Sequence, residues 1–476
     1  MSANLLTMNA MKKIYILVML VLTSTITMAQ TSVWNGGRTV WTQGSGTESD
    51  PYLIESADNL ALLAYMVNKG YNTEGMHFRL TTDIDLNGSE ELQWVPIGLG
   101  DRCYNDDGCN VGSAGNIRSC FQGHFDGNNH YISNIYIDNS DKKYGASAGL
   151  FGYAKGKNNN NEVSPAIIEN IFLTNGYIKG SFCGGIVGDG GSPASTVVSR
   201  CWNGATIEGV ASSRCGGIVG NNVYQVNNCY NKGTVTGYYA GGIVGYGTAL
   251  TIEECYNEGD ISGTYIGGIY GLSMRHDVYI NNCYNTGHID ASGENLMPTI
   301  PAGPAAGGIA GIFAGNSCTV ISCYNVGAVT STQDAGCILA FGPNATFLSN
   351  AYINTCTAGG EGTPLSEEYM RSQAFVDDLN GLNQVWALDE NNINDGFPIL
   401  VENNLAVKTS PEPSFKLYPN PTHGRFIVEG TGLVTIVDML GQQVYRQKID
   451  GILSIELPKG LYFVTLDNAT RKLVID

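Results

Sequence analysis

CYNKGTVTGYYAGGIVG, residues 229–245, decides the fold, because the same pattern recurs along the middle of the chain. It returns as CWNGATIEGVASSRCGGIVG from Cys201, CYNEGDISGTYIGGIYG from Cys255, CYNTGHIDASG from Cys283 and CYNVGAVTSTQDAGCILA from Cys323. A weaker copy, NIFLTNGYIKGSFCGGIVG, begins at Asn170. The cysteine starts lie 28, 26, 28 and 40 residues apart. A period of roughly 20 to 50 residues is typical of a stacked repeat architecture.

The units predict strands rather than helices. Each holds short β-rich runs, such as TIEECYN (251–257) and DVYINNCYN (277–285), and none has room for helices of about a dozen periodic residues. Three short strands fit one unit, so the fold class is all-β and each unit is one coil of a parallel β-helix. The Gly-Gly pairs suit bends with conformations that other residues resist. The Asn of each CYN is expected to stack at a turn, in the left-handed region that Asn tolerates.

The cysteine of each CYN is expected to face the interior as a small apolar residue. A metal or redox array is the alternative, but zinc-type ligands lie about two to four residues apart and these cysteines recur once per coil. We therefore predict no metal and no cofactor. Disulfides between neighbouring coils stay open, because stacked Cα atoms lie within disulfide distance. The 13 cysteines are an odd number, so at least one thiol is unpaired within the monomer.

Composition and charge narrow the class of protein. Lys and Arg total 25 against 43 Asp and Glu, a formal net charge of −18. A surface this acidic argues against nucleic acid and against unassisted binding to anionic lipid. Residues 1–30 are expected to be a secretory signal, with Lys12 and Lys13 before an apolar run. That run is too short for a membrane span, so the mature chain is expected to be exported without a transmembrane segment.

Residues 31–150 are expected to form an N-terminal cap and the first coils. Ser56 is a candidate N-cap of an amphipathic helix that ends at Gly70. This helix would cover the open edge of the first coil, since an uncovered strand edge invites aggregation. Its expected apolar face is Leu60, Leu63, Ala64 and Val67.

A calcium loop is a minor alternative in this region. The order Asp83, Asp85, Asn87, Gly88 matches the start of such a loop, but the twelfth position is Trp94 instead of Glu. The alternation of apolar residues around it favours a strand.

Two histidines lie further along the same region. His124 and His130 flank Asp126, but no third ligand or catalytic partner follows at a suitable spacing. We expect these residues to be structural.

The later part of the chain predicts a boundary and a second domain. Residues 151–405 are expected to hold the repeats and a C-terminal cap, with a second capping helix from Ser366 to Asn380. Residues 406–414 form a Pro- and Ser-containing linker. Residues 415–476 hold four stretches of strand pattern with Gly turns, which predicts a small antiparallel β-sandwich.

PYLIESADNLALLAYMVNKG, LTTDIDLNG, FQGHFDGNNHYISNI, GLFGY and the GGIVG and CYN units together resemble the GLUG-repeat proteins of secreted Bacteroidetes chains. The resemblance covers roughly Gly46 to Leu400. It implies a right-handed β-helix and a cell-surface role, and it implies no reaction. The chain lacks the H-E-x-x-H zinc signature that accompanies such repeats in proteases.

The tail is similar to the C-terminal sorting domain of the type IX secretion system. The similarity rests on Tyr418, Pro419, Asn420 and Pro421, on the VDMLGQQV turn and on KGLYFVTL. It implies interaction with the type IX machinery, passage across the outer membrane and removal of the tail. The rest would be released or attached to surface lipopolysaccharide.

Three function classes stay open at this stage. The first is a non-catalytic adhesin that binds a glycan or a surface protein. The second is a polysaccharide lyase or hydrolase, for which Arg275, His276 and Asp277, with Glu253 and Glu254 one coil earlier, are the candidate catalytic cluster. A charged triplet of this kind is usually a solvated loop. The third class is a passive spacer.

The coil that begins at Cys283 is about a dozen residues longer than its neighbours, and the excess falls between Ala291 and Ala306. Insertions into a coil loop outward, and repeat proteins often bind through such loops. A functionless insertion is the alternative. The candidate binding residues are Leu296, Met297, Pro298, Pro301 and Pro304.

Overall fold

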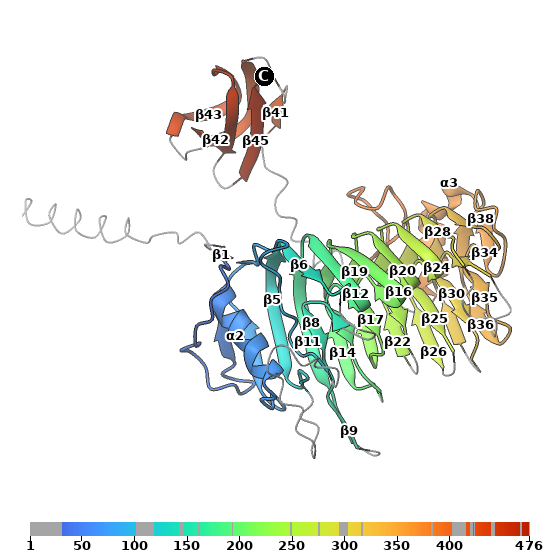
Figure 1. The fold of residues 1–476 in the computed structure, drawn as a ribbon. Coiled ribbons are helices and arrows are strands. Elements are labelled where there is room, and N and C mark those ends of the chain that lie inside the picture. Colours follow the sequence, from blue (N-terminus) through green and yellow to red (C-terminus); the bar gives the residue numbers. More distant parts are fainter. Residues whose placement is uncertain are drawn as a thin grey trace, which may run out of the picture. The chain divides into compact units, whose positions relative to one another are not determined.

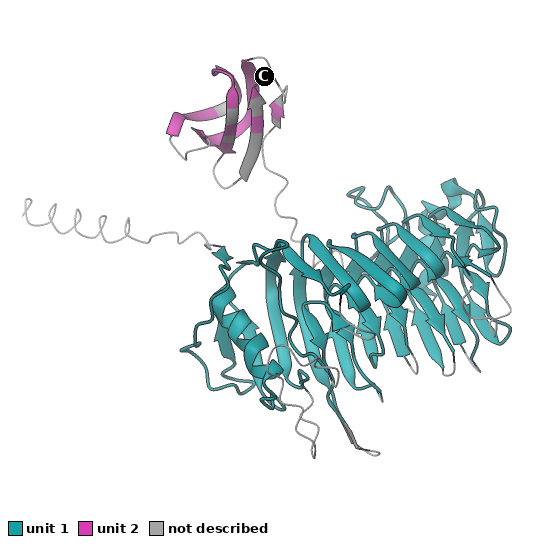
Figure 2. Ribbon diagram, in the orientation of Figure 1, with its two compact units in different colours: residues 1–400 teal, residues 401–476 magenta. Residues whose placement is uncertain are grey.

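The computed structural model describes residues 31–100, 119–141, 147–401 and 416–475, with short gaps at 160–161, 193, 248–249, 275–276, 295–302, 316–317, 382–383, 419–421, 423, 439–442 and 467–468. The chain divides into two compact units, residues 1–400 and residues 401–476 (Figure 2). The expected signal at 1–30 and the expected linker at 406–414 lie outside the described residues.

Unit 1 is a stack of short parallel strands arranged in three sheets (Figure 1). Sheet 1 has 19 strands, sheet 2 has ten and sheet 3 has seven. Residues one repeat period apart pair with each other in neighbouring coils: Tyr230 lies beside Tyr256 and Asn231 beside Asn257. The prediction of a mainly β chain with stacked parallel strands is confirmed.

The strands of sheet 1 are β1 (Ser32–Val33), β2 (Tyr52–Ile54), β3 (His77–Leu80), β4 (Ile84–Asp85), β5 (His124–Ser133), β11 (Ala166–Leu173), β14 (Thr196–Ser199), β15 (Trp202–Asn203), β18 (Gln225–Asn227), β19 (Tyr230–Asn231), β22 (Leu250–Glu253), β23 (Tyr256–Asn257), β26 (Val278–Asn281), β27 (Tyr284–Asn285), β31 (Cys318–Ile321), β32 (Tyr324–Asn325), β36 (Ala345–Leu348), β37 (Ala351–Ile353) and β38 (Thr363–Leu365). Those of sheet 2 are β6 (Ile135–Asp138), β7 (Ser147–Ala148), β12 (Gly176–Gly184), β16 (Thr206–Gly216), β20 (Val235–Gly241), β24 (Ile261–Gly267), β28 (Ile289–Ala291), β29 (Ala305–Gly307), β33 (Val329–Ser331) and β34 (Asp334–Gly336). Those of sheet 3 are β8 (Phe151–Tyr153), β13 (Val187–Asp189), β17 (Val219–Asn221), β21 (Val244–Tyr246), β25 (Tyr270–Ser273), β30 (Ala310–Phe313) and β35 (Leu339–Phe341). Two antiparallel pairs lie outside these sheets, β9 (Lys157–Asn159) with β10 (Glu162–Ser164) and β39 (Trp386–Ala387) with β40 (Ile399–Leu400).

A buried asparagine ladder joins the coils. Each side-chain Nδ2 donates to the Oδ1 of the next asparagine at 2.7–2.8 Å. It also donates to the carbonyl oxygen two residues further along its own coil. A satisfied hydrogen-bond chain of this kind is strong inside a protein because the local dielectric is low. The ladder consists of Asn203, Asn231, Asn257, Asn285 and Asn325, all of them fully buried.

The residues whose backbone is in the left-handed region, with positive φ, are not the ones predicted. The asparagines of the ladder are in strands, and the residue before each cysteine takes the positive φ instead, for example 51° at Asn228 and 53° at Glu254. This residue turns the corner between two short strands, so that the following cysteine faces the core. The prediction of stacked asparagines is confirmed, and the prediction that they adopt the left-handed region is wrong.

The Gly-Gly pairs are required by close packing rather than by unusual φ angles. A Cβ on Gly217 would lie 2.3 Å from the Cγ of Asn231, and a Cβ on Gly242 would lie 2.4 Å from the Cγ of Asn257. Each would also meet a carbonyl oxygen of the next coil, at 2.2 and 2.1 Å. Neither glycine is among the residues with positive φ, so the predicted reason for these glycines is wrong. Their absent side chain makes room for the asparagine ladder.

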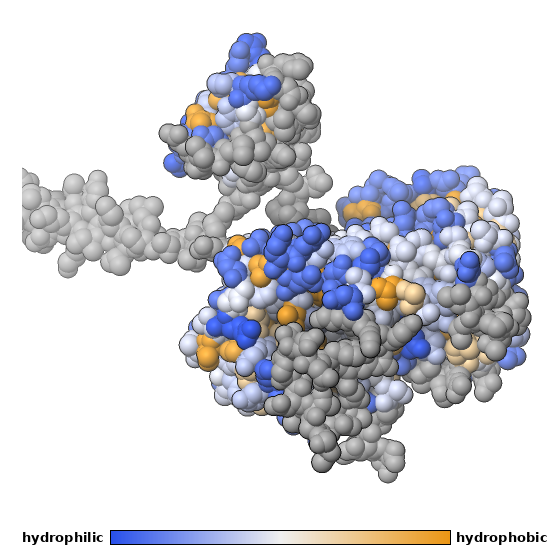
Figure 3. Space-filling view, in the orientation of Figure 1, coloured by the Kyte–Doolittle hydropathy of each residue, from blue (hydrophilic) through white to orange (hydrophobic). Residues whose placement is uncertain are grey.

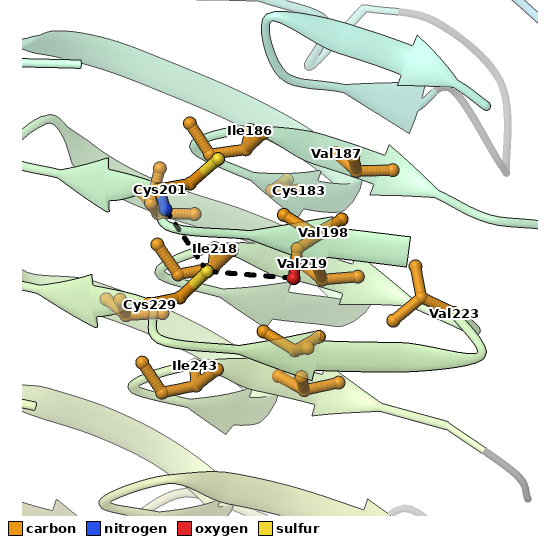
Figure 4. Packing of buried hydrophobic residues seen from close by; sticks show 14 of the residues in the cluster. Cys183, Ile186, Val187, Val198, Cys201, Ile218, Val219, Val223, Cys229 and Ile243 are labelled. Atoms are coloured by element: carbon orange, nitrogen blue, oxygen red, sulfur yellow. Dashed lines mark hydrogen bonds between the residues drawn. The ribbon is translucent and has the colours of Figure 1, made fainter. Parts of the chain in front are cut away.

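The cysteines of the repeats face the core, as predicted. Cys201 and Cys229 are fully buried in the main apolar cluster with Ile186, Val198 and Ile218 (Figure 4). Cys255 is fully buried in the same cluster. The backbone N–H of Cys201 points at the Sγ of Cys229, 3.3 Å away. None of the CYN cysteines is in a disulfide.

A stack of aromatic rings runs along the flank of the coils. Tyr230, Tyr256 and Tyr284 are parallel within 2°, with centroids 4.8 and 4.7 Å apart. The segment after β38 returns along this stack, where Trp386 contacts Tyr284 and Tyr324. Its helices α3 (Glu367–Met370) and α4 (Gln373–Asn380) begin at Ser366 and Ser372. The single capping helix predicted for Ser366–Asn380 is therefore two helices, and they bury the tyrosine flank.

The two ends of unit 1 are closed differently. Helix α2 (Ala57–Asn68) has the predicted cap at Ser56 and buries its apolar face in the main cluster, as predicted. At the other end, a disulfide between Cys337 and Cys356 ties the last coil to the segment that follows it. Cys337 stands where earlier coils have the second glycine, and the ladder position beside it is Tyr352 instead of Asn.

Unit 2 is a small antiparallel sheet. In the described residues its strands form one sheet rather than two, and twelve buried residues make its core. The strands are β41 (Lys416–Tyr418), β42 (Arg425–Asp438), β43 (Gln443–Glu456), β44 (Gly460–Leu466) and β45 (Ala469–Ile475).

Replacing Asn257 with alanine should lower the free energy of unfolding by about 2–4 kcal/mol, because the change leaves several buried polar groups without partners. Chemical denaturation of the purified protein measures this. Asn281→Ala, on the half-buried outer face of β26, is the matched control and should cost about 0.5 kcal/mol or less. Equal effects of the two variants would contradict a special role for the ladder.

Candidate binding surface

Most of the charged loop considered for catalysis lies outside the described residues. Of Arg275, His276 and Asp277, only Asp277 belongs to the described residues. Asp277 is exposed just before β26, whereas Glu253 and Glu254 lie at the far end of the paired strand β22. Four residues of strand, roughly 13 Å, separate Asp277 from Glu253 along the strand direction.

The carboxylates of Asp83 and Asp85, considered above as calcium ligands, instead bind groups of neighbouring coils. Asp83 Oδ1 lies 2.9 Å from His130 Nδ1 and accepts a hydrogen bond from the backbone N–H of Tyr131. Asp85 Oδ1 accepts from the side chain of Asn134 at 2.8 Å and from the backbone of Asn87. The described residues contain no group of three or more His, Cys, Asp and Glu side chains placed to hold a metal.

The other predicted histidine also joins coils. His124 Nε2 lies 2.6 Å from Glu169 Oε1, and Glu169 also pairs with Arg200. The hydrogen bond with His124 lowers the pKa of Glu169. These side chains come from three consecutive coils, so the network connects them on the outside.

Three of the buried repeat cysteines are poor candidates for chemistry. Burial raises the pKa values of Cys201, Cys255 and Cys323 well above the ordinary thiol value. A neutral thiol is a weak nucleophile and a weak metal ligand.

The face of unit 1 shown in Figure 3 carries few hydrophobic residues. On the face shown in Figure 3, hydrophobic residues form small separate spots among polar ones. A contiguous aromatic cluster outside the core is therefore informative.

Such a cluster lies on the outer face of sheets 2 and 3, and we call it the outer tyrosine cluster. Ala240, Ile266 and Ala306 face the core, so the preceding residue in each strand points outward. Tyr239 and Tyr265 stack with centroids 5.9 Å apart, and Tyr246 of the next sheet is 5.9 Å from Tyr239. The buried members are Tyr238, Tyr239, Tyr265, Leu272, Ala305 and Ile312, with Tyr246, Met274, Ala340 and Phe341 packed against them.

Arg214 forms the half-buried rim of this cluster. Its guanidinium carbon lies 4.0 Å from the ring centroid of Tyr246 and 5.2 Å from that of Phe182. Its Nη1 donates to Asn221 Oδ1 at 2.8 Å, and Asn221 Nδ2 donates to Asp189 Oδ1 at 2.7 Å. The contacts hold two aromatic faces, a guanidinium, an amide and a carboxylate in fixed positions.

The insertion joins sheet 2 beside the outer tyrosine cluster. It connects β28 to β29, and β29 carries Ala305 of the cluster. Leu296, Met297, Pro298 and Pro301 lie outside the described residues. Pro304 is buried, and its carbonyl accepts hydrogen bonds from the backbone of Asp334 at 3.0 Å and from Ser331 Oγ at 2.7 Å. Pro304 therefore belongs to the coil.

A pocket of about 340 Å³ lies between the returning C-terminal segment and the coils. Three of its four charged lining residues are paired, Arg371 with Glu367 at 2.8 Å and Glu258 with Lys232 at 2.9 Å, and the fourth is the exposed Asp395. Arg371 also covers the ring of Phe397. We assign no ligand to this pocket.

The tail has a recognisable identity. Residues 416–476 match the family of the secretion system C-terminal sorting domain. Unit 2 is a sorting domain. Such domains mark proteins that type IX secretion delivers to the cell surface or the extracellular space, and this protein is exported by that route. Tyr418 lies in β41 of the sorting domain, and Pro419, Asn420 and Pro421 lie outside the described residues.

Two curated proteins are similar to part of the chain. A protein of Evansella cellulosilytica named as a Gly-rich membrane protein is 33% identical over 150 residues, 31% of this chain and 14% of its own. Halomucin of Haloquadratum walsbyi is 30% identical over 178 residues, 37% of this chain and 2% of its own. This chain thus spans a small part of either relative. No solved structure matches, and no helix among the described residues is long and apolar enough to cross a membrane.

Removing calcium with a chelator should leave the melting temperature unchanged, because Asp83 and Asp85 are held by protein groups. Differential scanning calorimetry with and without EDTA tests this. A shift of several degrees that calcium alone reverses would establish a calcium site.

Proposed function

We propose that this protein is a non-catalytic, adhesin-like binding protein, exported by type IX secretion, that binds a glycan through the half-buried rim of the outer tyrosine cluster, at Arg214, Tyr246 and Phe182, and through the insertion. The proposal includes a right-handed β-helix of the GLUG-repeat kind and a cleaved N-terminal signal. The part of the chain that remains after removal of the sorting domain is then released or attached to surface lipopolysaccharide. The observation that carries the proposal is an aromatic cluster outside the core with a polar rim at Arg214.

The chemistry of the rim suits a sugar. Aromatic faces such as those of Tyr246 and Phe182 bind the apolar face of a pyranose ring. Planar polar groups such as those of Arg214, Asn221 and Asp189 pair with hydroxyls. Ligand sites typically combine an apolar floor with a few fixed polar groups, and the contacts of Arg214 reduce the ordering cost of binding.

The position of the insertion supports the same surface. Loops carried on a rigid scaffold are common binding elements, and this one emerges next to the cluster. The enzyme alternative has no comparable support, since Asp277, the described residue of its charged loop, lies at the opposite end of the paired strands from Glu253 and Glu254.

Export should involve two cuts. The mass of the exported protein should show loss of residues up to about Ala29 or Gln30 and loss of the sorting domain. Intact mass spectrometry of the secreted and surface fractions measures both. A mature surface protein that retains Tyr418–Asp476 in a wild-type strain would contradict removal of the tail.

Deleting residues 295–302 while keeping Pro304 should preserve the fold and weaken glycan binding. Tyr246→Ala should weaken it about tenfold, or about 1.4 kcal/mol. The measurement is a glycan array followed by titration of the best glycan, with circular dichroism as the folding check. Tyr279→Ala, half-buried on sheet 1, is the matched control and should change nothing. Binding unaffected by either change would place the site elsewhere, and binding only to proteins would contradict the glycan.

A further inference from the structure

Arg214 is a half-buried cation that neighbouring coils hold in place. On sheet 2 its partners in the register are Phe182 in the coil before it and Tyr239 in the coil after it. On sheet 3 it donates a hydrogen bond to Asn221, which pairs in register with Tyr246 of the next coil. The guanidinium therefore lies among aromatic rings that three successive coils supply.

This cation has no carboxylate partner. Arg79, Arg200 and Arg371 of unit 1 each pair with an Asp or Glu side chain. Arg214 belongs to none of the ion pairs among the described residues. A half-buried charge is normally paired, because taking it out of water is costly. Its unpaired state is therefore unexpected in a chain with 43 acidic against 25 basic residues.

The guanidinium also keeps most of its hydrogen-bonding capacity. A guanidinium has five N–H groups in a planar fork. Within the described part of the chain it makes one hydrogen bond, from Nη1 to Asn221 Oδ1 at 2.8 Å. The rings of Tyr246 and Phe182, with centroids 4.0 and 5.2 Å from the guanidinium carbon, restrict its movement. A fork held in this way is suited to a carboxylate, which accepts two parallel N–H bonds from it.

From this geometry, and resting on the glycan-binding function proposed above, we infer that Arg214 selects glycans that carry a uronic acid. The carboxylate of the sugar accepts hydrogen bonds from the unused N–H groups of the guanidinium and supplies its missing counter-charge. Phe182 and Tyr246 contact the sugar ring beside it. A neutral sugar can use the same rings but leaves the cation unpaired, so the acidic sugar binds more tightly.

The acidity of the chain limits the kind of acidic glycan that can bind. Asp189, one coil before Asn221, accepts hydrogen bonds from Asn221 Nδ2 at 2.7 Å and from the backbone N–H of Gly191 at 2.8 Å, which partly neutralise it. Exposed carboxylates further away are screened, because the Debye length at physiological salt is about 8 Å. A polyanion that extends over many coils meets those carboxylates directly, whereas one acidic sugar at Arg214 does not. The ligand is therefore a glycan with a single uronic acid rather than a polyuronate.

The test uses the protein in its exported form and a panel of matched oligosaccharides, with affinity measured by isothermal titration calorimetry. The panel ends in glucose, galactose, glucuronic acid, galacturonic acid, the methyl esters of the two acids and 6-sulfated galactose. The esters keep the shape of the acids and remove the charge. The wild type should bind at least one of the acids about tenfold or more tightly than its ester, because a hydrogen bond to a charged group contributes more than one to a neutral group.

Two variants of Arg214 separate its charge from its shape. Arg214→Gln should bind the acid and the ester equally, whereas Arg214→Lys keeps the charge without the fork and should retain part of the preference. Arg38→Gln is the matched control, since Arg38 also lacks a carboxylate partner among the described residues and lies over the ring of Tyr65, 4.4 Å from its centroid. This control should leave the preference unchanged, and circular dichroism checks the fold of each variant.

The outcomes distinguish the selectivity from the binding function. Equal affinity of the wild type for acids and esters would overturn the selectivity and leave glycan binding intact. So would a preference for the acid that Arg214→Gln keeps, or binding of the sulfated sugar with no binding of either acid. If no sugar of the panel and no glycan of the array binds, the glycan-binding function is wrong and the selectivity fails with it.

Discussion

The side-chain hydrogen bond from one asparagine to the next is the constraint on which unit 1 depends. Its 2.7–2.8 Å length requires the coils to stack in register at the spacing of paired strands. Because the amides are fully buried, any slip of register would leave several polar groups without partners, at about 1–3 kcal/mol each. The ladder therefore selects one register from many that the apolar core alone would allow.

The glycine pairs follow from the same constraint. Gly217 and Gly242 sit so close to the asparagine side chains and to the next coil that a Cβ has no room. Where the ladder ends the restriction ends too, since Tyr352 replaces the asparagine and Cys337 replaces the glycine. The space that the ladder no longer uses holds the disulfide with Cys356.

Outside the ladder the coils tolerate variation, and the candidate surface uses that freedom. The insertion interrupts sheet 2 between β28 and β29, but each half keeps its own partners in the coils on both sides. The interruption therefore costs no coil pairing. The outer tyrosine cluster reaches this point through Ala305, and the rim at Arg214 lies three strands away along sheet 2.

The repeat spacing by itself determined the stacked strands, the inward cysteines and the stacked asparagines, because each is a local pattern that recurs once per coil. The Ser56 cap and the sorting domain could likewise be predicted from the sequence, because each is recognised from short contiguous motifs. Only the tertiary structure decided where the left-handed residues lie, because the corner at Asn228 depends on which side chains must face the core. It also decided the burial of the tyrosine flank under Trp386 and α4, the Cys337–Cys356 pair and the approach of Tyr239 to Tyr246. Those contacts join residues that no local periodicity relates, and they exist only once the coils have closed.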